Sequence, residues 1–260
     1  MNGRLTQTDL LKAPWHHFDT IDSTNAFLMG LAPHERIPGT SCSADVQTRG
    51  KGRNDRIWFS PPGGLYLSVL FIPSRPLEDW GSLSLAAGLA SKLAIERING
   101  NLSIMFKWPN DLLLHDKKVA GILIQSRHGD SPFAVIGIGI NVLTSIDDLP
   151  HRLLFPATSL RSEDDMDWSI RELMEAVRFE LIKTVFEWET SKKAIMDLWK
   201  LSSATIGRTI RINVVGQTLE GVDQGIDEHG NLIVETESGT RTILAGDLLG
   251  YQPHEHNSAH

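Results

Sequence analysis

Short apolar runs alternate with Gly- and Pro-rich turns over residues 16–150, a pattern typical of a mixed α/β domain. The run from Leu65 to Phe71 is bounded by Pro61-Pro62-Gly63-Gly64 and by Pro73, which predicts a buried strand. Further strands are expected at Ser43 to Gln47, Leu112 to Leu114, Val119 to Ile124 and Ala134 to Val142.

One helix is expected inside this region. Leu85, Leu89 and Leu93 recur every four residues, so they line one helical face. The pair Asn99-Gly100 predicts where this helix ends.

A longer helix is expected from about residue 166 to 200. Ser169 and Glu172 match a capping box at its start. About 30 residues is long for one helix, so a break is expected near Thr190-Ser191. The apolar stripe of this helix is assigned to core packing and comprises Ile170, Leu173, Val177, Leu181, Val185 and Trp188.

The C-terminal part of the chain has the pattern of short strands. Ile210, Ile212 and Val214 alternate with polar residues, as in a half-buried strand. Turn residues at His229-Gly230-Asn231 and Ser238-Gly239 separate two more apolar runs. About 50 residues of short strands predict a small barrel-like domain. The polar residues 253–260 are expected to form a disordered tail.

Composition narrows the class of protein. The 260 residues carry a net charge of −7, which argues against a chain whose main role is to bind phosphate backbones. No run of about 18 apolar residues occurs, and the first 15 residues do not resemble a signal peptide. The single Cys42 fits a reducing compartment and is interpreted as a small packed side chain. We therefore expect a cytoplasmic protein without membrane association.

The first segment with candidate chemistry is the loop Gly50-Lys51-Gly52-Arg53-Asn54-Asp55-Arg56. Its two glycines let the backbone approach a ligand and offer N–H groups to an anion. Arg53 and Arg56 add side chains that bind phosphate or carboxylate in a fork. The glycine positions match neither the P-loop nor the Rossmann fingerprint. A solvated basic loop is the alternative, and the residues alone do not decide between the two.

Two further clusters and the single residue Lys118 have the same ambiguity. Lys107-Trp108-Pro109-Asn110-Asp111 gathers a cation, an aromatic residue, an amide and a carboxylate, but Pro-Asn-Asp also occurs in an ordinary turn before a strand. Lys118 enters an apolar run and is either an inward ligand contact or a surface lysine. Ser23-Thr24-Asn25 suits both a helix N-cap and hydrogen bonding to a neutral polar ligand. No zinc-ligand spacing and no nucleophile elbow occurs, so no protein metal site is expected.

The order and spacing of these clusters closely resemble the biotin–protein ligase family. The resemblance covers about residues 20–160 and is most specific at Lys107 to Asp111. It implies an α/β (α+β) fold, in which a mixed-sheet catalytic domain of the biotin/lipoate ligase type precedes a small SH3-like β-barrel domain. The expected divisions are an N-terminal segment 1–19, a catalytic domain 20–204, a C-terminal domain 205–252 and the tail 253–260.

The resemblance also implies an activity and a set of site residues. The activity is ATP-dependent formation of biotinyl-5'-AMP, followed by transfer of biotin to a lysine of a biotin carboxyl carrier protein, with Mg²⁺ on the phosphates. Lys118, Arg53 and Asp111 are the implied catalytic residues. The implied biotin contacts are Ser23, Thr24, Asn25, Gln47, Gly50, Lys51, Gly52, Arg53, Lys118 and Gly121. The implied ATP contacts are Lys51, Arg53, Arg56, Lys107, Asn110, Asp111, Lys118 and Asn141.

The chain departs from the family at two loop positions. Lys51 stands in place of the usual arginine, which removes the bidentate fork, and Asp55 stands in place of a usual glycine. Only about 20 residues precede Asp22, too few for a helix-turn-helix domain, so we expect a monofunctional ligase that binds no specific DNA and is a monomer or homodimer. The alternatives are a lipoate or octanoate ligase, which lacks the Lys107–Asp111 block, and a non-catalytic biotin-sensing regulator.

Overall fold

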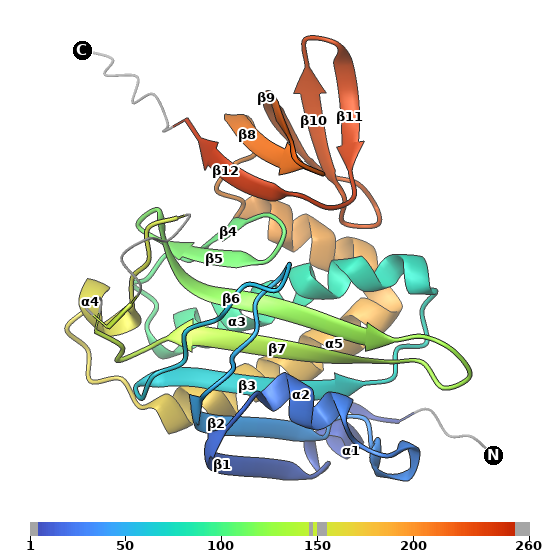
Figure 1. Cartoon of the computed structure of the whole chain (residues 1–260), viewed down its shortest axis with the longest axis vertical. Helices are drawn as coiled ribbons and strands as arrows, with labels where there is room; N and C mark the ends of the chain where they lie inside the picture. Colours follow the sequence, from blue (N-terminus) through green and yellow to red (C-terminus); the bar gives the residue numbers. More distant parts are fainter. Residues whose placement is uncertain (1–4, 146–147, 150–154, 253–260) are drawn as a thin grey trace.

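A seven-stranded mixed sheet forms the centre of the molecule (Figure 1). The computed structural model describes residues 5–145, 148–149 and 155–252. The strands follow the spatial order β1-β2-β3-β7-β6-β5-β4, and only β1 and β2 pair in parallel. Their bounds are β1 Trp15–Ile21, β2 Ser41–Gln47, β3 Gly64–Phe71, β4 Met105–Lys107, β5 Asp111–Leu114, β6 Lys117–Arg127 and β7 Phe133–Asn141.

Helices cover the two faces of the sheet unequally. The long helices α3 (Leu83–Ile98) and α5 (Ile170–Leu201) pack against each other on one face, whereas α2 (Thr24–Met29) lies on the other (Figure 1). The shorter elements are α1 (Gln7–Leu11), η1 (Pro33–Glu35), η2 (Leu77–Ser82) and α4 (Leu160–Glu163). The face of the sheet on which α2 lies is therefore covered by less helix than the other face.

Strand alternation distributes side chains between these two faces. Leu65, Leu67 and Val69 in β3 belong to the core formed with α3 and α5, whereas Leu70 joins a smaller core with Leu28 of α2. Ser68 has the same parity as Leu70 and so lies on the α2 face, fully buried. A hydroxyl group is thus placed on the face where the sheet is least covered.

The predicted break in the long helix is confirmed. The backbone of α5 is helical except at Ser191, whose φ of −139° and ψ of 47° lie outside the helical region. Cys42 is fully buried in the smaller core, and burial raises the pKa of its thiol to about 12. This agrees with its interpretation as a packed side chain.

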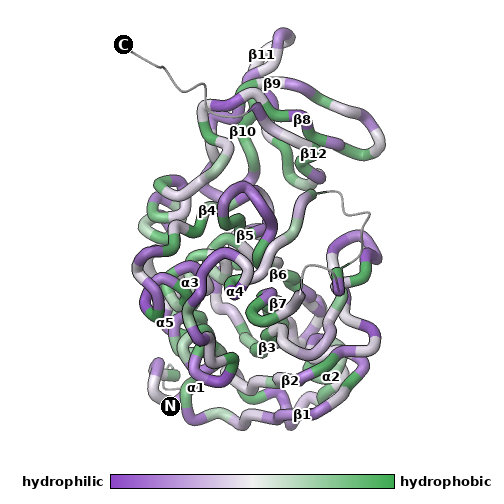
Figure 2. Tube along the Cα trace, turned by 90° about the vertical axis from the view of Figure 1, so that its left-hand side faces the viewer, coloured by the Kyte–Doolittle hydropathy of each residue, from purple (hydrophilic) through white to green (hydrophobic). Residues whose placement is uncertain are grey.

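The C-terminal strands form a separate antiparallel sheet of order β11-β10-β9-β8-β12 at one end of the larger domain (Figures 1 and 2). The predicted fold class, a mixed-sheet domain followed by a small β domain, is confirmed. The strands are β8 Thr209–Val214, β9 Gln217–Ile226, β10 Leu232–Thr236, β11 Gly239–Ile243 and β12 Asp247–Tyr251.

The N-terminal segment differs from its expected limits. Residues 15–21 form β1 and pair with β2, so the expected division after residue 19 falls inside a strand of the main sheet. The sequence pattern missed this strand because most of its side chains are exposed and polar. The expected disordered tail 253–260 lies outside the described residues. Among the described helices, none has both the length and the apolar character needed to span a membrane.

Candidate functional site

A cavity of about 410 Å³ lies on the α2 face of the sheet. Strands β6 and β7 form its floor, the segment 51–59 covers it, and β12 of the C-terminal sheet borders it. This volume suits a small organic ligand. Of the residues expected at the site, all but Gly50 line this cavity: Ser23, Thr24, Asn25, Gln47, Lys51, Gly52, Arg53, Arg56, Lys107, Asn110, Asp111, Lys118, Gly121 and Asn141.

Neutral hydrogen-bonding groups form one end of the cavity. Ser23 is the N-cap of α2, and its Oγ accepts from the N–H of Ala26 at 3.4 Å. Thr24 donates from its backbone N–H to Gln47 Oε1 at 2.9 Å. The N-cap role of this segment is confirmed, and because the segment also lines the cavity, its hydrogen bonding to a ligand stays a prediction.

Two residues that the sequence did not single out, Ser68 and Gln125, hold the side chains at this end without lining the cavity themselves. Ser68 Oγ lies 2.7 Å from Thr24 Oγ1 and 2.6 Å from Asn25 Oδ1. Asn25 Nδ2 donates to Gln125 Oε1 at 3.1 Å. Isolated polar residues in strands give no local signal, so only their place in the sheet identifies them. The resulting network fixes the side-chain amide of Asn25 in one orientation.

Glycines in the floor let other side chains approach the sheet closely. A Cβ added at Gly137 would lie 2.2 Å from Asn25 Oδ1, and one at Gly139 would lie 2.5 Å from the indole of Trp58. A Cβ at Gly121 would lie 2.9 Å from Trp58 as well. The absence of side chains at these positions therefore makes room for Asn25 and Trp58 over the floor.

Replacing Gly137 with alanine is expected to raise the KM for the small ligand by about tenfold or more, because Asn25 must leave its hydrogen-bonded position and one such contact is worth about 1–2 kcal/mol. The steady-state KM measures this change. Gly81→Ala is the matched control, since an added Cβ there meets no atom within 4 Å. Equal KM values for the two variants would contradict this account of the floor.

Charged groups form the opposite end of the cavity. The buried carboxylate of Asp111 accepts from Lys107 Nζ at 2.8 Å and pairs with Lys118 Nζ at 2.5 Å. Burial raises the pKa of Asp111, but Lys118 and Lys107 outweigh burial and lower the pKa to about 2. Asp111 is therefore ionised at neutral pH, and it is better suited to orienting the two lysines than to accepting a proton.

The ammonium groups of both lysines also lie over aromatic rings. Lys118 Nζ is 5.3 Å from the ring centroid of Trp58, and Lys107 Nζ is 4.8 Å from that of Phe155. These cation–π contacts add to the attraction that holds each amine in place beside Asp111. The structure contradicts the alternative that Lys118 is a surface lysine, because its amine pairs with Asp111 in the cavity.

The arginines of the covering loop contact the C-terminal sheet. Arg53 donates to Asn110 Oδ1 at 3.4 Å and lies 3.8 Å from Asp247 Oδ1. Arg56 forms an ion pair with the same carboxylate, and Asn54 Nδ2 donates to it at 3.2 Å. Asp247 was not identified from the sequence, because its partners are more than 190 residues away. It connects the loop to β12.

The covering loop is a hydrogen-bonded hairpin. Gly52 donates its N–H to Arg56 O at 2.7 Å, and Trp58 donates to Gly50 O at 3.0 Å. Asn54 and Asp55 at its tip have φ values of 52° and 56°, a conformation that Asn and Asp tolerate better than most residues. The departure at Asp55 is thus accommodated by the backbone. Gly50 lies at the base, where an added Cβ would be 2.4 Å from Trp58 O.

The two asparagines expected on the nucleotide side are held by backbone groups. Asn110 Nδ2 donates to Ile122 O at 2.7 Å, and Asn141 Nδ2 donates to Thr158 O at 2.9 Å. The two hydrogen bonds therefore connect strands β6 and β7 to neighbouring segments beside the cavity.

The cavity thus has a neutral hydrogen-bonding end and a cationic end, which suit a ligand that carries both a polar ring and an anionic group. Residues 17–141 match the biotin/lipoate A/B protein ligase family, and residues 205–248 match the biotin protein ligase C terminal domain. The chain belongs to the biotin protein ligase family.

Individual relatives agree with this assignment. The chain is 33% identical over 234 residues to the bifunctional ligase/repressor BirA of Bacillus spizizenii, covering 88% of this chain and 72% of that protein. It is 30% identical over 247 residues to the biotin–[acetyl-CoA-carboxylase] ligase of Mycobacterium tuberculosis, covering 90% and 89%. The biotin protein ligase from Aquifex aeolicus, solved in complex with biotin and ATP, superposes with a TM-score of 0.78 at 28% identity and coverages of 92% and 98%.

Proposed function

We propose that this chain joins biotin to AMP with ATP and then transfers the biotinyl group to a lysine of a biotin carboxyl carrier protein. The observation that carries the proposal is the pairing of two chemically different ends in one cavity. The Ser23–Asn25 network suits the neutral ureido ring of biotin, and the group around Asp111 suits a carboxylate beside phosphates.

In the first step a biotin carboxylate oxygen attacks the α-phosphorus of ATP, and pyrophosphate leaves. Two anions must meet, so the barrier falls when fixed cations face the charge that develops on the phosphoryl oxygens. Lys118 and Lys107 are held in place by Asp111, and Arg53 lies across the cavity near Asn110. We assign these three cations to charge stabilisation and Asp111 to their orientation.

In the second step the acceptor amine attacks the carbonyl carbon of the adenylate, and AMP leaves. A lysine amine is protonated at neutral pH and must lose a proton before it attacks. Asp111 has too low a pKa to be an effective base for this proton. We therefore assign the cationic cluster a second role, which is stabilising the AMP that departs.

Mg²⁺ is expected to enter as the complex with ATP. The two cavity carboxylates among the described residues, Asp111 and Asp247, are both occupied by lysine or arginine partners. The donor set therefore favours metal ligands from the phosphate oxygens rather than from a fixed protein cage.

The direct test is incubation with ATP and an isolated biotin-acceptor domain, with labelled biotin in one arm and labelled lipoate in the other. We expect label on the acceptor only with biotin, because the amide and hydroxyl end suits a polar ring. Transfer of lipoate instead would assign the lipoate-ligase alternative. Binding of biotin without transfer would assign the regulator alternative.

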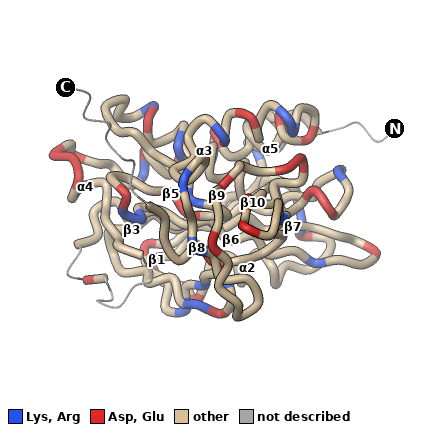
Figure 3. Tube along the Cα trace, turned by 90° about the horizontal axis from the view of Figure 1, so that it is seen from above, with Lys and Arg blue, Asp and Glu red and all other residues tan. Residues whose placement is uncertain are grey.

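Specific DNA binding is not expected. Lys and Arg are interspersed with Asp and Glu around the trace (Figure 3), and the net charge is −7. Non-specific affinity for DNA depends mainly on phosphate neutralisation, so any binding should weaken steeply with salt. A gel-shift assay at physiological salt with biotin and ATP measures this. Sequence-dependent retardation would contradict the expectation.

A further inference from the structure

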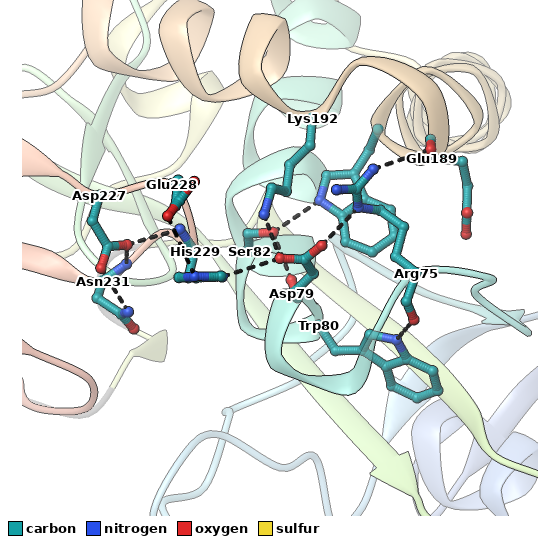
Figure 4. Close-up of polar contacts among 11 residues, drawn as sticks. Arg75, Asp79, Trp80, Ser82, Glu189, Lys192, Asp227, Glu228, His229 and Asn231 are labelled. Carbon is teal, nitrogen blue, oxygen red and sulfur yellow. Dashed lines mark hydrogen bonds and ion pairs between the residues drawn. The ribbon is translucent and has the colours of Figure 1, made fainter.

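A second contact joins the two domains away from the cavity, at the turn between β9 and β10 (Figure 4). The turn is internally bonded, since Asp227 Oδ1 accepts from the backbone N–H groups of His229 at 2.8 Å and of Asn231 at 2.9 Å. Asn231 Nδ2 also donates to Asp227 Oδ2 at 2.9 Å. These bonds present the His229 side chain and the Gly230 carbonyl to the catalytic domain as one rigid unit.

His229 contacts Asp79, a buried carboxylate in η2. Its Nδ1 lies 3.1 Å from Asp79 Oδ1. The same carboxylate accepts from Arg75 Nε at 2.9 Å and pairs with Lys192, the residue that follows the Ser191 kink in α5 (Figure 4). Burial raises the pKa of Asp79, but the hydrogen bonds from Lys192, Arg75 and His229 outweigh burial and hold the pKa below its usual range. Asp79 is thus an ionised acceptor shared by both domains.

Gly230 contacts the block of residues at the cationic end of the cavity. The indole Nε1 of the buried Trp108 donates to Gly230 O at 3.0 Å. Trp108 follows Lys107 directly and lies three residues before Asp111. An added Cβ at Gly230 would come within 2.9 Å of Leu85, so the turn fits closely against α3. Displacement of the turn would therefore remove the hydrogen-bond partner of Trp108.

We propose that Asp79 and His229 are positioning residues, which dock the β9–β10 turn so that Gly230 holds Trp108 and, through it, the nucleotide-binding Lys107 and Asp111. This inference rests on the proposed function, because it assigns the contact an effect on ATP. Asp79 and His229 line neither the ligand cavity nor the covering loop. Their effect is on geometry, and they touch no substrate.

Several charged groups surround His229. Asp79 faces Nδ1 from η2, and Glu228 Oε1 lies 3.8 Å from Nε2 on the turn itself. Asp227 is the other carboxylate of the turn, while Arg75 and Lys192 reach His229 only through Asp79. The imidazole ring of His229 therefore faces a carboxylate at each nitrogen.

The test uses the full chain, with His229→Ala and His229→Gln measured beside wild type. Initial rates of adenylate formation at pH 8 give the KM for ATP and the KM for biotin. His229→Ala should raise the KM for ATP about tenfold, the effect of losing one hydrogen bond to a charged group. The KM for biotin should rise less than the KM for ATP, because the Ser23–Asn25 network does not contact the turn.

The glutamine variant separates positioning from mere structural support. Its amide still donates to Asp79, so its KM for ATP at pH 8 should lie within about threefold of wild type. His34→Ala, an exposed histidine in η1, is the matched control and should behave as wild type.

An unchanged KM for ATP in His229→Ala would overturn the proposal, as would equal rises for ATP and biotin. A KM for ATP in His229→Gln as high as in His229→Ala would also overturn it. Wild-type protein that forms no biotinyl adenylate would instead contradict the proposed function, so the two failures are distinguishable.

Discussion

Lys118→Ala is expected to slow adenylate formation by about 30- to 1,000-fold, which corresponds to about 2–4 kcal/mol of lost charge stabilisation. The amine of Lys118 lies 2.5 Å from Asp111 and faces the cavity beside Trp58. Its position is set before the substrates arrive, so its removal costs the transition state more than the bound ground state. Pyrophosphate release in single-turnover experiments measures the loss.

The adjacent Lys117 is the matched control for this variant. Its amine pairs with Glu163 at 2.8 Å, outside the cavity. Lys117→Ala removes the same charge and the same number of atoms, so it should leave the rate within about twofold of wild type. Near wild-type pyrophosphate release in Lys118→Ala would refute the role assigned to Lys118. Equal losses of rate in both variants would show that the loss of one positive charge matters, whatever the position of the amine.

Asp111→Asn is expected to lower both activity and stability. The amide has the shape of a protonated carboxyl but no charge, so the buried Lys107 and the partly buried Lys118 lose their shared counterion. A carboxyl whose pKa falls from 3.8 to about 2 on folding contributes about 2 kcal/mol to the free energy of unfolding at neutral pH. Urea unfolding at pH 7 should show a loss of about this size.

The contribution of Asp111 to the free energy of unfolding depends on pH because the pKa of its carboxyl is lower in the folded protein than in the unfolded chain. The folded protein binds the Asp111 proton less readily than the unfolded chain does, so the contribution is complete above about pH 4. It is lost as pH falls towards 2. The difference in unfolding free energy between wild type and Asp111→Asn should therefore shrink between pH 5 and pH 3. Asp45→Asn, which changes an exposed carboxylate in β2, is the control and should cost less than about 0.5 kcal/mol at pH 7.

A difference between wild type and Asp111→Asn that stays constant from pH 5 to pH 3 would contradict the ionised assignment. Adenylate formation at the wild-type rate in this variant would show that Asp111 does not orient the lysines.

Much of the fold could be predicted because its signals are local. The apolar run of β3 lies between proline and glycine turns, and the four-residue spacing of Leu85 and Leu89 appears in α3 as expected. The length of the second stripe predicted the break found at Ser191. Strand β1 was missed because its exposed edge position gives it no apolar pattern, although the sheet still pairs its backbone.

Part of the candidate site could likewise be predicted from local segments of the sequence. The glycine-rich loop, the Lys107–Asp111 block and the Ser23–Asn25 N-cap are continuous segments, so their residue types by themselves indicate ligand chemistry. Their ambiguity is also local, because a basic loop or a Pro-Asn-Asp turn has the same sequence whether it faces a ligand or solvent. The order of the blocks along the chain resolves that ambiguity at the level of the family.

Tertiary structure alone decided which side chains meet. The pairing of β5 with β6 brings Lys118 to Asp111, and the pairing of β3 with β7 sets Ser68 beside the helix that carries Asn25. Asp247 reaches Arg53 and Arg56 across more than 190 residues, and His229 reaches Asp79 across 150. Hydrophobic periodicity determines which face of an element is buried, but it does not choose the partner of that face. The partners, and with them the charge state of Asp111, depend on the packing of the whole chain.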